Sequence, residues 1–99
     1  MRYYGSEEER AAAKQKALAI HGPNGEVRCS WEDCTVTDHD MLTLDHVEND
    51  GRERRSVGEG RGNGLYRKAS KGVIPGLQTL CANHNLKKEL LRRRAHKGE

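Results

Sequence analysis

Four residues of the chain have the types and spacings of a zinc site. Four residues separate Cys29 from Cys34, and two separate Cys81 from His84. Tetrahedral zinc takes four such sulfur and nitrogen ligands, and each pair lies at an expected chain reversal or helix start, where two side chains can converge on one ion. His39 is a competing fourth ligand, but His84 is preferred because it lies within one helical turn of Cys81. We therefore expect these residues to bind one structural zinc ion: Cys29, Cys34, Cys81 and His84.

The composition is that of a domain that needs such a metal. Of the 99 residues, 33% are hydrophobic and 4% are aromatic. A core built from so few apolar side chains rarely stabilises a domain without disulfides or a metal. The three cysteines argue against a closed disulfide framework, and the polar N-terminus resembles no secretory signal. We expect a single domain over residues 1–99, cytoplasmic and without a membrane-spanning segment.

A second group of residues offers oxygen ligands and a base. Asp45 and His46 lie between the two halves of the expected zinc site, and Asn85 directly follows His84. Carboxylate and amide oxygens suit a hard divalent cation, and a neutral histidine can accept a proton near pH 7. This division of ligands predicts two different metals in one domain. Adjacent side chains of a regular strand point to opposite faces, so the strand should end or distort at Asp45 and His46.

Local signals predict the elements that position these residues. A capping box at Ser6 and an alanine-rich segment predict a supporting helix over residues 6–20. Patterns of apolar residues then predict the other elements: strands over 41–47 and 77–80, a long loop over 48–64, a short helix over 65–71, and a helix from Cys81 or Ala82 to about Ala95 with Leu86, Leu90 and Leu91 as its core-facing stripe.

The strings LDHVENDGRERR and YRKASKGVIPGLQTLCANHNLKKE resemble the HNH endonucleases, also named His-Me finger or ββα-metal nucleases. The similarity is greatest to small phage and bacterial members that carry zinc ligands around the site, and it covers residues 27–90. It implies an α+β fold in which a zinc-stapled ββα-metal core over 27–95 follows the supporting helix.

The same resemblance implies roles for individual residues. Asp45 and Asn85 would bind a catalytic Mg²⁺ or Mn²⁺ ion, and His46 would be the general base. The middle Asn of the family falls at Gly76, so another group must orient the imidazole of His46. The candidates for this role are a backbone carbonyl in the loop after His46, the side chain of Asn49 and the side chain of Asn63. Trp31, inside the first cysteine pair, is expected to cover the zinc.

The distribution of charge predicts a polyanionic partner. Residues 29–50 hold seven acidic residues and no Lys or Arg, whereas 51–85 hold seven basic residues against two acidic ones. Basic side chains after an acidic metal site suit phosphate contacts that position DNA without reading its bases. The residues expected to make such contacts are Arg55, Arg67, Lys88, Arg92 and Arg93.

These observations predict a metal-dependent DNA endonuclease that nicks with low sequence specificity. The alternatives are a non-catalytic zinc-stapled nucleic-acid-binding module and an accessory subunit of a phage packaging or restriction machine. The sequence leaves a homodimer open as well. The Asp45-His46 pair with Asn85 favours the enzyme, because a module that only binds nucleic acid does not need these residues.

Overall fold

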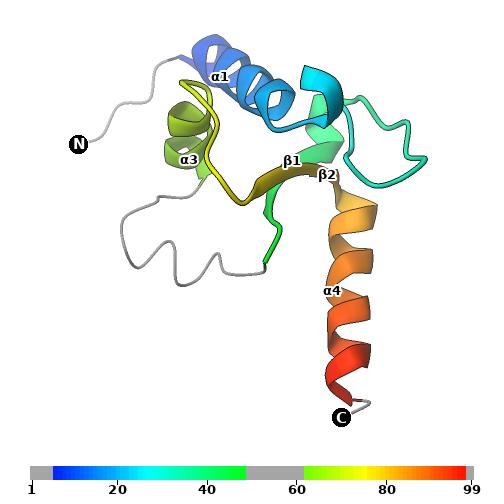
Figure 1. The fold of residues 1–99 in the computed structure, drawn as a ribbon. Helices are drawn as coiled ribbons and strands as arrows, with labels where there is room; N and C mark the ends of the chain where they lie inside the picture. Colours follow the sequence, from blue (N-terminus) through cyan, green and yellow to red (C-terminus); the bar gives the residue numbers. More distant parts are fainter. Residues whose placement is uncertain (1–5, 49–61, 98–99) are drawn as a thin grey trace.

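The computed structural model describes residues 6–48 and 62–97 (Figure 1). It confirms an α+β fold with an N-terminal helix, a two-stranded antiparallel sheet and a C-terminal helix. The elements in chain order are α1 (Glu7–Ile20), the 3-10 turns Pro23–Gly25 and His39–Met41, β1 (Leu42–His46), α3 (Gly62–Ala69), β2 (Leu77–Cys81) and α4 (Ala82–Lys97).

Helix α1 begins at the predicted capping box. The Ser6 hydroxyl accepts a hydrogen bond from the Glu9 backbone N–H at 3.2 Å, and the Glu9 carboxylate accepts one from the Ser6 N–H at 3.4 Å. These two bonds satisfy donors that the first turn of a helix leaves without a partner. At its other end, α1 buries Ala17 and Leu18 completely, which confirms the prediction of a helix that supports the rest of the fold.

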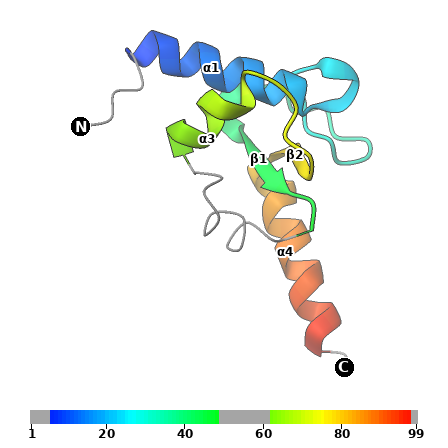
Figure 2. The same cartoon turned by 60° about the vertical axis from the view of Figure 1, so that its left-hand side comes forward.

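The antiparallel register of β1 and β2 determines which residues lie opposite one another in the sheet. Asp45 is opposite Gln78, and Leu42 is opposite Cys81. In Figures 1 and 2, α1 lies above the strands and α4 extends below them. Helix α4 continues directly from β2, so the end of β2 and the first turn of α4 are fixed together.

Two details of the predicted elements are wrong. Residues 62–64, predicted as loop, belong to α3. Leu65 and Ala69 are buried, and a regular helix over that pair needs the residues before it as hydrogen-bond acceptors. The predicted core-facing stripe of α4 is also incorrect, because Leu86 is 60% exposed and Leu91 is 44% exposed. Helix α4 extends beyond the sheet, so most of its length has no element of the described residues to pack against (Figure 1).

The hydrophobic core is small, as the composition predicts. Its fully or nearly fully buried side chains include Leu18, Leu42 and Leu80, and the three cysteines are part of the same cluster. Over residues 6–48 and 62–97, none of the helices combines the length and the hydrophobicity that a membrane crossing requires.

Candidate metal centre and the Asp45 site

The structure brings the four predicted zinc ligands together. The Cys34 and Cys81 sulfurs are 4.0 Å apart, and His84 Nδ1 lies 3.6 Å from Cys29 Sγ and 3.3 Å from Cys81 Sγ. All four ligand atoms lie within 4.8 Å of one another. A tetrahedral zinc ion with Zn–S bonds of about 2.3 Å and a Zn–N bond of about 2.0 Å places two sulfurs about 3.8 Å apart and sulfur and nitrogen about 3.5 Å apart. The group could therefore hold a structural zinc ion.

The ligands of this Cys3His cluster come from three parts of the fold. Cys29 and Cys34 lie in the segment after α1, Cys81 is the last residue of β2, and His84 is in the first turn of α4. The first pair is shaped by a tight turn in which the Cys34 N–H donates to the Trp31 carbonyl at 3.0 Å. Asp33 adopts a left-handed φ of 64° within this turn. An ion at the cluster would join these three segments.

Backbone hydrogen bonds support the sulfurs. The Cys81 N–H donates to Cys29 Sγ at 3.2 Å. Burial raises the pKa of the Cys29 thiol to about 11, whereas a hydrogen bond from the Val36 backbone lowers the pKa of the Cys34 thiol. A metal binds the thiolate form, so binding at this cluster releases a proton from the buried Cys29.

Trp31, which is predicted to cover the zinc, packs against one of the four candidate ligands. Its ring stacks on the imidazole of His84, with centroids 4.8 Å apart and planes inclined by 3°. This stacking fixes the plane of the imidazole while Nδ1 faces the sulfurs. His39, the competing ligand, belongs to a separate surface group with Asp38 and Asp40. The preference for His84 is thus consistent with the structure.

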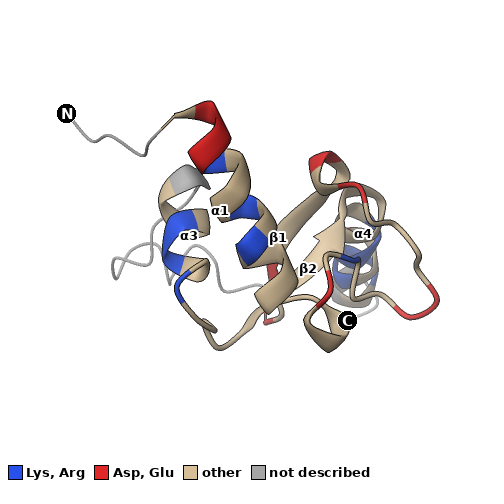
Figure 3. Cartoon of the chain, turned by 90° about the horizontal axis from the view of Figure 1, so that it is seen from above, with Lys and Arg blue, Asp and Glu red and all other residues tan. Residues whose placement is uncertain are grey.

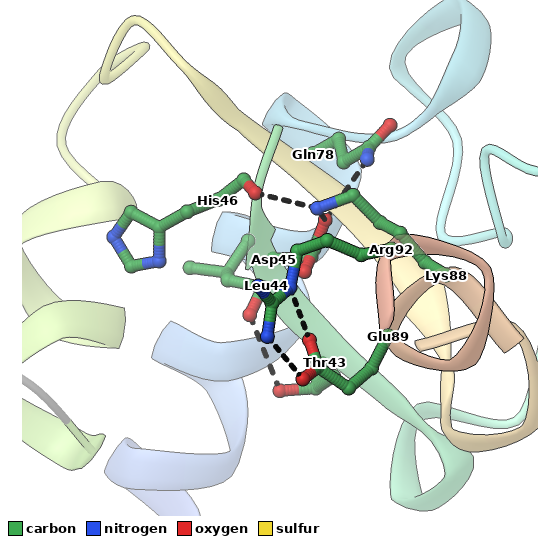
Figure 4. Close-up of polar contacts among 8 residues, drawn as sticks. All are labelled: Thr43, Leu44, Asp45, His46, Gln78, Lys88, Glu89 and Arg92. Carbon is green, nitrogen blue, oxygen red and sulfur yellow. Dashed lines mark hydrogen bonds and ion pairs between the residues drawn. The ribbon is translucent and has the colours of Figure 1, made fainter. Parts of the chain in front are cut away.

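The Asp45 carboxylate lies between the sheet and α4 and is already engaged there. Its Oδ2 accepts hydrogen bonds from Gln78 Nε2 at 2.9 Å and from the Lys88 ammonium at 3.0 Å (Figure 4). The same ammonium donates to the His46 carbonyl oxygen at 2.8 Å. Only 10% of the Asp45 side chain and 18% of the Lys88 side chain are exposed. A cation therefore lies against two oxygens of the Asp45-His46 segment.

His46 is the last residue of strand β1, one residue before the predicted end of the strand. Figure 4 shows its imidazole pointing away from the Asp45 carboxylate and from Lys88. This follows from strand geometry, in which neighbouring side chains alternate between faces. The structure thus brings Asp45 to α4 without turning His46 toward the same point. Asn85 is half-buried in the first turn of α4, next to His84.

Gly76, where the resemblance to HNH endonucleases would place an Asn, contacts this segment through its backbone. Its carbonyl accepts a hydrogen bond from the Val47 N–H at 2.9 Å, so it holds the residue that follows His46. Gly76 has a φ of 85°, a left-handed conformation that glycine adopts without strain and that asparagine tolerates better than most residues. Asn49 lies outside the described residues, as does the side chain of Asn63.

The predicted phosphate-binding residues have varied surroundings. Arg67 is exposed on α3, and Arg92 and Arg93 are exposed on α4, where both bond the Glu89 carboxylate. Figure 3 shows basic residues on α1, α3 and α4 and acidic residues on the segments between α1 and β1. Lys88 instead contacts Asp45, as described above, and Arg55 lies outside the described residues.

Sequence reasoning did not identify Gln78, which bonds Asp45 from the opposite strand. The register Asp45–Gln78 makes this contact, and a register cannot be read from either strand alone. The one local signal is that Gln78 stands between Leu77 and Thr79 in the strand, so its side chain faces away from theirs.

Comparison with known proteins gave no match: no family model, no curated protein and no solved structure matches this chain. The resemblance to HNH endonucleases therefore rests on the sequence strings quoted above.

Proposed function

We propose that this chain is a metal-dependent DNA endonuclease of the HNH type, with a ββα-metal core stapled by zinc. The observation that carries the proposal is the position of Asp45 and His46 at the end of β1, next to the helix that bears Asn85. The Cys3His cluster joins that helix to the rest of the fold, so it would fix the distance between the two halves of the site.

The donors that the proposal assigns to a divalent ion are oxygen atoms, the type that such an ion prefers. The Asp45 carboxylate, the His46 carbonyl and the Asn85 amide are hard oxygen donors, and a cation, the Lys88 ammonium, rests on the first two. Asp45 and Asn85 would hold a Mg²⁺ or Mn²⁺ ion, which would offset the charge that develops on the phosphate and the leaving oxygen. His46 would take the proton of the attacking water.

The proposal requires the His46 side chain to turn when a phosphate is bound. Its imidazole now points away from Asp45 (Figure 4). His46 is the last residue of β1 and is only half-buried, so the turn would be a rotation of a partly exposed side chain about its Cα–Cβ bond. Exposed Arg67, Arg92 and Arg93 would contact the DNA backbone and hold the duplex in place.

A plasmid assay tests this function. Zinc-loaded protein is incubated with supercoiled DNA in Mg²⁺, Mn²⁺ or chelator, and nicked and linear products are separated on a gel. We expect nicking that requires the added ion. His46→Ala should reduce the rate by about 10²-fold or more because it removes the general base. His39→Ala is the matched control, since His39 lies on a surface turn in a different group, and it should cut like the wild type.

Two results would contradict the assignment. Cutting that persists in His46→Ala would show that another group activates the water. Equal cutting in chelator would show that no divalent ion is needed.

One observation favours a second function, a zinc-stapled module that binds nucleic acid without cutting it. Asp45 Oδ2 is neutralised by Lys88 and bonded by Gln78, as a structural carboxylate would be. Such a module would retard DNA in a gel-shift assay equally well as wild type and as His46→Ala, and neither protein would cut the plasmid.

A further inference from the structure

We infer that the Lys88 ammonium is the resident cation of the Asp45 site and that a divalent ion must displace it to bind. The inference deepens the proposed function by assigning a control on ion entry, and it rests on that function for the use of the ion. The Lys88 ammonium and the divalent ion compete for the Asp45 carboxylate.

The contacts of Lys88 define this site. Its ammonium bonds Asp45 Oδ2 at 3.0 Å and the His46 carbonyl oxygen at 2.8 Å. Both oxygens come from consecutive residues at the end of β1, and the lysine reaches them from α4. The ammonium therefore has two oxygen ligands of the kind that a hard divalent cation also takes.

Burial strengthens the ion pair between Asp45 and Lys88. The Asp45 side chain is 10% exposed and that of Lys88 is 18% exposed. Water screens such a pair less than a surface ion pair, and removing one partner leaves a buried charge without compensation. Gln78 orients the carboxylate by bonding the same Oδ2 at 2.9 Å, but it is neutral and leaves the charge to Lys88.

Displacement follows from charge. With Lys88 in place the carboxylate and ammonium cancel, so the pair offers a divalent ion little attraction. An ion bound to Asp45 beside the ammonium would also be repelled by it at short range. Lys88 must therefore leave Asp45 Oδ2 when the ion binds, and the length of its side chain allows the ammonium to move while α4 stays fixed.

The neighbouring lysine provides a matched control. Lys87 is on the same helix and is exposed, so Lys87→Met removes the same charge from the chain without touching Asp45. Any general effect of net charge on the attraction of cations appears in both variants, whereas release of the Asp45 carboxylate appears only in Lys88→Met.

The test measures Mn²⁺ binding to zinc-loaded protein at fixed pH, from the electron paramagnetic resonance signal of free Mn²⁺. We expect Lys88→Met to bind Mn²⁺ about tenfold more tightly than wild type, equivalent to about 1.4 kcal/mol. Lys87→Met should match the wild type, and Asp45→Asn should lose the site. Zinc content and circular dichroism establish that each variant is folded; if Lys88→Met is not, Lys88→Gln replaces it, because the amide can still donate to the His46 carbonyl.

An affinity that is unchanged or weaker in the folded Lys88 variant would overturn the inference, and so would the absence of Mn²⁺ binding in every protein. The outcome is separable from that of the plasmid assay. A chain that shows the expected order of affinities and cuts no DNA would contradict the proposed function and leave the role of Lys88 standing. A chain that cuts DNA and binds Mn²⁺ equally well with and without the Lys88 ammonium would support the proposed function and contradict the role of Lys88.

Discussion

Thr79 and His21 show how single polar side chains join α1 to the sheet. Thr79 is fully buried, and its hydroxyl donates to the Leu18 carbonyl at 2.8 Å. His21 Nδ1 lies 2.8 Å from the Ala17 carbonyl, and Nε2 accepts from the Ile74 N–H at 2.9 Å. Because Nε2 accepts, the ring is neutral with its proton on Nδ1. The Thr79 hydroxyl thus gives a partner to a carbonyl in the last turn of α1, where helix carbonyls often lack one, whereas the Ala17 carbonyl also accepts from the His21 backbone N–H at 3.1 Å.

Thr79→Val tests the value of this contact. The substitution keeps the shape of the side chain and removes the donor, so the buried Leu18 carbonyl loses a partner. We expect the free energy of unfolding to fall by about 1–3 kcal/mol, measured by urea denaturation in excess zinc. Thr37→Val, at an exposed position, should change it by less than about 0.5 kcal/mol. Equal effects at the two positions would show that the Thr79 hydroxyl contributes nothing specific.

Contacts between residues close in the sequence can be predicted from it, whereas contacts between distant residues cannot. Cys81 and His84 are three residues apart, so their convergence follows from local helix geometry. Lys88 and Asp45 are 43 positions apart, and their contact depends on the path of α4 relative to β1. The sequence placed both residues near one phosphate and gave no sign that they bond each other.

Helix α4 illustrates the same limit for a whole element. Its start at Ala82 was predicted within one residue, because the cysteine and histidine of the cluster mark it. The burial of its apolar residues was not predicted correctly. An amphipathic pattern predicts burial only where a second element lies alongside the helix. Leu86 and Leu91 are exposed because α4 leaves the sheet after its first turns (Figure 2).

The exposed part of α4 is stabilised instead by charged side chains. Glu89 accepts hydrogen bonds from Arg92 at 2.6 and 3.0 Å and from Arg93 at 3.0 Å. The bond from Arg92 is the main reason that the pKa of Glu89 falls from its ordinary 4.5 to about 2. Pairs at these spacings support a helix from its own surface.

The pairing of Glu89 with Arg92 and Arg93 depends on pH. Because the folded state lowers the pKa of Glu89, the pairing contributes to stability above about pH 4.5 and is lost as the pH falls toward 2. Carbon NMR should show the Glu89 carboxyl still ionised at about pH 4, where a glutamate with the ordinary pKa is partly protonated. Arg92→Gln should return Glu89 toward the ordinary range. A Glu89 carboxyl that titrates with a pKa near the ordinary 4.5 would contradict the pairing.

The whole molecule depends on a small core with the Cys3His cluster at one side of it. The cluster joins the segment after α1, the end of β2 and the start of α4, and its three cysteines are themselves core residues. Few large apolar side chains are buried elsewhere in the described residues, so the energy of metal binding would contribute directly to the energy of folding. An ion bound there would also fix the position of Asp45 relative to α4.

The zinc content of the purified chain tests this account most directly. Elemental analysis of folded wild-type protein should find about one zinc ion per chain. His84→Ala and Cys81→Ser should lose most of it and unfold more readily, whereas His39→Ala should keep it. Folded wild-type protein without zinc, or loss of zinc in His39→Ala but not in His84→Ala, would contradict the assignment of Cys29, Cys34, Cys81 and His84 as the metal ligands.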